Sequence, residues 1–157
     1  MSHFVNSPMK VKDQSALVAA LQEWLCSSEN RTTAAARYAS LSPDQRAKFA
    51  KLLVEVHEQP QALFGYGGDV RAQRAHVIVR RQHIFGASND VGFLKNADGT
   101  FTAIVSEFDR RQAPKLINDV AALTGLHASM AVARTRGLPF ERRRDAKGRH
   151  QLVVTTR

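Results

Sequence analysis

Apolar residues recur at helical spacing near the start of the chain, just after a strand-like segment. Residues 3–11, "HFVNSPMKV", have the character of a strand, and Pro8, which lacks a donor N–H, predicts a place at a sheet edge. Asp13 is a suitable N-cap for the following helix. The apolar stripe of this predicted helix comprises Leu17, Val18, Leu21, Trp24 and Leu25.

A second helix is predicted by the capping signal "SPDQ". Ser42 can cap the helix, Pro43 suits its first position, and Gln45 completes a capping box. The pattern predicts a helix from Pro43 to about His57, ended by Pro60. Its expected inward positions are Phe49, Leu52, Leu53 and Val56. Residues 62–69, "ALFGYGGD", are expected to form a flexible loop, because they lack the context and the Lys-Ser/Thr ending of a phosphate-binding loop.

The middle of the chain has the pattern of β-structure. Residues 74–81, "RAHVIVRR", predict a strand, and residues 89–109 predict a hairpin that turns at Asp98-Gly99, where glycine permits a positive φ.

The last third predicts two helices and a second hairpin. The first helix opens at Pro114 and stops at Gly125, and the second covers residues 127–137, with Gly137 at the C′ position. The closing hairpin turns at "DAKG", residues 145–148. Strands and helices are mixed without strict alternation, which is typical of the α+β class. We therefore expect a single domain over residues 1–157, a mostly antiparallel sheet with helices packed on one face, and a projecting C-terminal basic hairpin over residues 138–157.

Length and composition agree with one globular domain. The chain has 157 residues, of which 43% are hydrophobic and 24% are charged. No apolar run approaches the roughly 20 residues that span a bilayer, and the start has no signal-peptide stretch. Cys26 is the single cysteine, so no intramolecular disulfide can form. These features predict a cytoplasmic protein without a membrane partner.

The net charge of +9 is concentrated in the last third of the chain. Residues 110–157 contain eleven Lys and Arg against three Asp and Glu, whereas the rest is nearly neutral. If Phe140 faces the core, so do Arg142 and Arg144, and a strand does not bury unpaired arginines. The tip should therefore project into solvent and contact a polyanion. The candidate binding residues are Arg110, Arg111, Arg134, Arg136, Arg142, Arg143, Arg144, Lys147 and Arg149.

Signals for catalysis are weak. The six histidines have no close metal-binding spacing, and Cys26 at a helix end is best explained as a small buried hydrophobe. Glu107 and Asp109 would share a face of one strand, but a helix-capping role for Asp109 is the better interpretation. We expect no catalytic residue, no metal and no cofactor.

Three segments carry a resemblance to a known family: "YGGDVRAQRAHVIVRR", "SNDVGFLKNADGTF" and "RGLPFERRRDAKGRHQLVV". In them and in its start, "MSHF", the chain resembles the hypothetical chloroplast open reading frame thirty-five family, a domain of unknown function found in plastids, cyanobacteria, other bacteria and phages. Leu138-Pro139 departs from the family's usual Gly-Phe, and residues 27–62 look like a helical insertion. The resemblance implies an α+β fold, a non-enzymatic role, and an adaptor function for an AAA-type ATPase.

The leading functional hypothesis is a small non-enzymatic protein whose C-terminal basic face contacts nucleic acid or another polyanion. One alternative is an adaptor or phage-type inhibitor that docks an acidic protein through the same hairpin. Another is an enzyme that uses Glu107, Asp109 or a histidine. The first two both need only positive charge, so the sequence does not separate them. The sequence also indicates that the hairpin arginines contribute little to stability.

Overall fold

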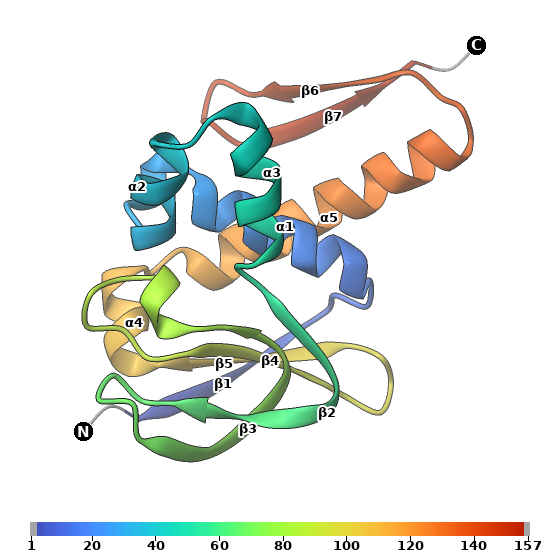
Figure 1. Cartoon of the computed structure of the whole chain (residues 1–157). Coiled ribbons are helices and arrows are strands. Elements are labelled where there is room, and N and C mark those ends of the chain that lie inside the picture. The colour runs from blue at the N-terminus through green and yellow to red at the C-terminus, as the bar shows by residue number, and fades with distance from the viewer. Residues whose placement is uncertain (1–2, 156–157) are drawn as a thin grey trace.

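The computed structural model describes residues 3–155 and has the predicted α+β architecture, with one five-stranded antiparallel sheet, a layer of helices and a separate hairpin (Figure 1). The strand order in the sheet is β1-β5-β4-β3-β2. The elements in chain order are β1 (Phe4–Met9), α1 (Gln14–Cys26), the 3-10 turn η1 (Ser28–Asn30), α2 (Thr33–Ala39), α3 (Pro43–Lys51), β2 (Glu55–Phe64), β3 (Val70–Val79), the 3-10 turn η2 (Arg81–His83), β4 (Val91–Lys95), β5 (Phe101–Ser106), α4 (Glu107–Gln112), α5 (Leu116–Thr135), β6 (Phe140–Arg144) and β7 (His150–Val154).

The main core lies between one face of the sheet and the helices α1 and α5. Four residues of the predicted stripe of α1, namely Leu17, Leu21, Trp24 and Leu25, are buried there, whereas Val18 is half-buried. Phe93 and Phe101 fill the sheet side of the same core. The helices thus form the middle layer of the molecule, with the sheet on one side and the β6–β7 hairpin on the other (Figure 1).

A second, smaller core shows that the sheet curls strongly. Leu63, Ala75, Ile78 and Ile104 pack together on the opposite face from the helices. A methyl group on Gly92 would lie 2.6 Å from the Cβ of Ala75, so only glycine fits where the curled strands approach. The Arg71 guanidinium of β3 lies 5.5 Å from the centre of the Phe4 ring of β1. The curl therefore brings the start of β3 over the far edge of the sheet.

Several local predictions are confirmed. Asp13 caps α1 by accepting a hydrogen bond from the N–H of Ala16. Ser42 and Gln45 form the full capping box of α3. Gly99 and Gly137 have φ values of 87° and 63°, as the predicted hairpin turn and helix end require.

The predicted helix from Pro43 to His57 is wrong beyond Lys51. Residues 55–64 instead form β2, which pairs with β3 as the edge of the sheet. Leu52 and Val56, expected inside, are 75% and 47% exposed. The ladder to β3 outweighs the helical pattern, and Pro60 is tolerated because the register shifts between Val56 and Gln61 on an edge strand. The segment of residues 27–62 is thus helical only in its first part.

The loop and two helices predicted elsewhere also differ from the structure. Residues 62–64 belong to β2, and Gly65–Asp69 is a closed turn in which the Gly65 N–H donates to the Asp69 carbonyl. The strand predicted over residues 74–81 is β3, which begins at Val70. The helices predicted on either side of Gly125 are one helix, α5, because Gly125 lies on its exposed side and costs little packing.

Helix α5 is long and apolar enough, by length and composition alone, to cross a membrane. In this fold its apolar side chains have another role, since Val120, Leu123 and Leu126 are buried in the main core. Its partners in packing are α1 and the strand β7.

The closing hairpin lies beyond the sheet, as predicted, and forms its own two-stranded sheet. Phe140 pairs with Val154, Arg142 with Leu152, and Arg144 with His150. Leu152 packs against the main core, so the hairpin rests on the helical layer. The N–H of Asp145 donates to the Arg149 carbonyl, which closes the predicted turn. Arg157 lies outside the described residues.

Candidate functional site

An open cleft of about 1080 Å³ lies between the hairpin and the helices α1 and α5. The hairpin folds back over the helices after the end of α5, so its tip comes to lie opposite the start of α5 and the end of α1 (Figure 1). Five basic residues line this cleft, namely Lys115, Arg142, Arg144, Lys147 and Arg149. The acidic lining residues are Glu23, Glu29 and Asp119, so positive charge predominates.

Arg142 is held firmly against α1. Its two terminal nitrogens donate to the two carboxylate oxygens of Glu23, each at 2.9 Å. His127 of α5 lies 3.0 Å from the same carboxylate. Burial by itself raises the pKa of Glu23, but the hydrogen bonds and charges of Arg142 and His127 outweigh it and hold the pKa below its usual value. This bidentate pair joins the hairpin, α1 and α5.

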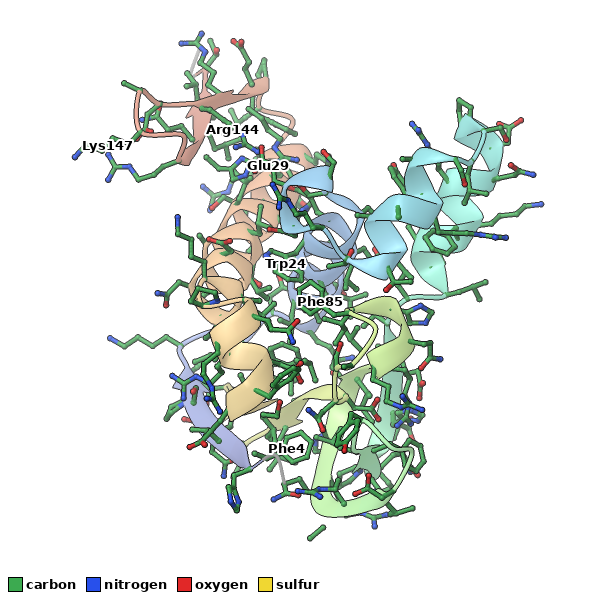
Figure 2. The ribbon with its side chains drawn as sticks, turned by 90° about the vertical axis from the view of Figure 1, so that its left-hand side faces the viewer. Phe4, Trp24, Glu29, Phe85, Arg144 and Lys147 are labelled. Atoms are coloured by element: carbon green, nitrogen blue, oxygen red, sulfur yellow. The ribbon has the colours of Figure 1, made fainter. Side chains whose placement is uncertain are left out.

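Arg144 has a much looser partner on the same face of β6. One guanidinium nitrogen lies 3.3 Å from the carboxylate of Glu29 in η1; the Arg144 side chain is about half exposed, and that of Glu29 about two-thirds. Figure 2 shows Arg144 beside Glu29, with Lys147 at the tip of the hairpin. Lys115 and Lys147 are exposed and have no carboxylate within ion-pair distance among residues 3–155. The cleft therefore offers two lysines and one weakly held arginine to a ligand.

The other predicted binding residues lie away from the cleft or form ion pairs within the hairpin. Arg143 points to the opposite face and pairs with Glu141 at 2.9 Å. Arg149 lines the cleft but is bound to Asp145 of the turn at 2.7 Å. Arg134 lies over the Phe140 ring, 5.3 Å from its centre. Arg136 caps the end of α5, and Arg110 and Arg111 lie on α4; none of these three lines the cleft.

Few aromatic rings in the cleft can stack on a nucleobase. Trp24 lines the cleft but is buried, and its indole N–H has no hydrogen-bond partner in the described part of the chain. Tyr38 is half-buried, and the Arg46 guanidinium lies over its ring at 4.8 Å from the centre. The cleft is therefore better suited to contacts with phosphate groups than to base stacking.

Sequence reasoning missed three residues of this site. Lys115 precedes the first residue of α5, and nothing in its neighbourhood marks it as part of the hairpin surface. Glu23 and Glu29 lie more than a hundred residues before their arginines. The available signal was weak: Glu23 lies beside the apolar stripe of α1, so a carboxylate at the border of that helix could have been considered as a partner.

The carboxylate pair considered for catalysis is not on a strand. Glu107 and Asp109 are in the first turn of α4, where Ser106 is the N-cap. Asp109 is 1% exposed, and its Oδ2 accepts hydrogen bonds from the Ser106 hydroxyl and from the N–H of Asn89. Ser106 is therefore the N-cap, and the carboxylate of Asp109 accepts a hydrogen bond from the hydroxyl of that cap. Through Asn89, Asp109 also connects α4 to the segment before β4.

The remaining polar candidates do not converge on one site. Burial raises the pKa of the Cys26 thiol to about 11, which is the opposite of what a thiolate nucleophile needs. No group of three or more histidine, cysteine, aspartate or glutamate side chains within residues 3–155 could hold a metal ion.

A second ion-pair cluster joins the edge strand β2 to Arg80, which follows β3, and to Asp90, which precedes β4. The Nε and Nη2 atoms of Arg80 donate to the two carboxylate oxygens of Glu55 at 2.7 and 3.0 Å, and its Nη1 donates to Asp90 at 2.8 Å. The hydrogen bond from Arg80 lowers the pKa of Glu55, and His57 adds to this effect against the opposing influence of burial. This cluster has a structural role.

We expect the stabilisation that Glu55 provides to depend on pH. Because its pKa is lower in the folded protein than the ordinary value of 4.5, the effect is complete above that value and is lost as the pH falls through the folded pKa. The urea midpoint of Glu55→Gln should therefore lie below that of the unsubstituted protein at neutral pH and approach it in acid. Glu58→Gln, exposed on the same strand, is the control. A midpoint difference that does not change with pH would contradict this expectation.

The fold and the cleft define a class: a small α+β protein with a basic hairpin clasped over a helical layer. Comparison with protein-family models, with curated proteins and with solved structures found no match to this chain. The resemblance to the hypothetical chloroplast open reading frame thirty-five family therefore stays a prediction.

Proposed function

We propose that the protein binds nucleic acid through the phosphate backbone, with the cleft and the hairpin tip as the contact surface. The observation that carries this proposal is the set of Lys115, Arg144 and Lys147 around one open cleft: within residues 3–155 the two lysines have no carboxylate partner, and Arg144 is weakly paired. Phosphate contacts of this kind supply affinity without reading the sequence. The shortage of exposed rings in the cleft supports the same mode.

The salt dependence of binding to a fluorescent DNA duplex tests this proposal. If three side chains each neutralise one phosphate, the logarithm of the affinity should fall linearly with the logarithm of the salt concentration, at a slope of about −2.7. Fluorescence anisotropy over a salt series measures this slope. Duplexes of unrelated sequence should give similar affinities. An affinity that barely changes between low and physiological salt would contradict the proposal.

An acidic protein partner is the competing outcome. A pull-down from lysate with and without nuclease separates the two, since nucleic acid that co-purifies and disappears after nuclease supports the proposal. An acidic protein that stays bound after nuclease, together with no DNA binding by anisotropy, would favour the adaptor role. Association with an AAA-type ATPase, which the family resemblance implies, stays a prediction that the same pull-down can report.

A further inference from the structure

Two arginine–glutamate pairs hold the same face of β6 against the helical layer, but they differ in strength. Arg142 and Glu23 make two hydrogen bonds of 2.9 Å, and Glu23 is further contacted by His127. Arg144 and Glu29 make one contact of 3.3 Å, with exposed fractions of 49% and 66%. The first pair has the geometry of a fixed anchor. The second has the geometry of a surface pair, which is easily exchanged in water.

The weaker pair is at the place where the proposed ligand would bind. Arg144 and Glu29 both line the cleft, as do Lys115 and Lys147. A phosphate group presents oxygens to a guanidinium as a carboxylate does, and Arg donates two hydrogen bonds to either group in a bidentate arrangement. A phosphate group that enters the cleft beside Arg144 therefore competes with Glu29 for the guanidinium.

We infer that Glu29 is an intramolecular competitor that occupies Arg144 in the free protein and is displaced when a phosphate enters the cleft. This inference rests on the proposed function, because it describes how the same cleft is regulated. Arg142 is the positioning residue that keeps the hairpin in place, and Arg144 is the residue that changes partner. The carboxylate of Glu29 thus lowers the affinity for nucleic acid and disfavours anions that cannot also engage the lysines.

The test compares two substitutions that change the net charge equally. Glu29→Gln releases Arg144 inside the cleft. Glu141→Gln releases Arg143 on the opposite face of the same strand, where the pair is 2.9 Å apart and similarly exposed. Affinity for the fluorescent DNA duplex is measured by anisotropy at one low salt concentration. We expect Glu29→Gln to bind about threefold to fivefold more tightly than the unsubstituted protein, as loss of a weak competing pair allows. We expect Glu141→Gln to bind within about twofold of it.

Two further outcomes keep the inference separate from the proposed function. If both variants bind more tightly by the same factor, or if neither differs from the unsubstituted protein, the competitor role of Glu29 is wrong while nucleic-acid binding stands. If no form of the protein binds the duplex, the proposed function fails, and the inference fails with it.

Glu23→Gln adds a second readout, because it should lower the melting temperature without the gain in affinity expected of Glu29→Gln. A gain in affinity from Glu23→Gln as large as that from Glu29→Gln would contradict the distinction between anchor and competitor.

Discussion

Replacing both Arg144 and Lys147 with alanine should weaken binding to a DNA duplex by roughly tenfold or more, about 1.4 kcal/mol, with little change in melting temperature. Both side chains line the cleft, and neither makes a strong contact within the fold. Loss of two phosphate contacts should also make the salt slope shallower by about 1.8. Anisotropy over a salt series and a thermal melt measure the two effects.

The matched control removes two charges elsewhere. Arg110→Ala combined with Arg136→Ala lowers the net charge by the same amount, but neither residue lines the cleft. If this control weakens binding as much as the cleft variant does, the surface acts through overall charge and the cleft is not the site. If the cleft variant binds normally, the contact surface lies elsewhere on the protein.

Arg142 is kept intact in the cleft variant for a structural reason. The sequence indicated that the three consecutive arginines, Arg142 to Arg144, contribute little to stability. The structure assigns them different contacts, because Arg142 holds Glu23 of α1 with two hydrogen bonds, Arg143 pairs within its own strand, and Arg144 has one long contact. A triple substitution would combine a loss of the hairpin's anchor with a loss of binding, and the two effects could not be separated.

The largest stability effect is expected from Asp109→Ala, which should lower the free energy of unfolding by roughly 2–4 kcal/mol. The substitution leaves the buried hydroxyl of Ser106 and the N–H of Asn89 without their acceptor. It also removes the acceptor near the Asn89 side-chain amide, which lies 3.2 Å away. Buried donors without a partner carry the full cost of their desolvation. Urea unfolding measures the loss.

Glu107→Ala is the control for this prediction. Glu107 lies in the same helical turn but is exposed, so its replacement should change stability by no more than about 0.5 kcal/mol. Equal losses from the two variants would contradict the structural role assigned to Asp109. Unchanged stability in Asp109→Ala would contradict it as well, and would reopen a chemical role for this carboxylate.

Features that depend on neighbouring residues could be recognised in the sequence alone. Asp13, Ser42 and Gln45 identified helix starts because a cap needs only a side-chain acceptor within three residues. Asp98-Gly99 and Gly137 identified turns because positive φ is a property of the single residue. The apolar stripe of α1 and the concentration of charge after residue 110 could also be recognised in the sequence, since both are patterns along the chain.

Features that depend on residues distant in the chain became visible only in the folded protein. Residues 55–57 were expected to end a helix and residues 62–64 to begin a loop, but pairing with β3 and the ion pair between Arg80 and Glu55 make residues 55–64 a strand. The cleft exists because the hairpin folds back over α1 and α5 (Figure 1), and this placement puts Lys115 and the hairpin tip on the same cleft and brings Glu23 to Arg142. Glu23 and Arg142 are 119 residues apart in the chain. The position of a charge in the sequence does not indicate which opposite charge it will pair with in the fold. The division of the arginines into anchor and contact residues could therefore be seen only in the folded protein.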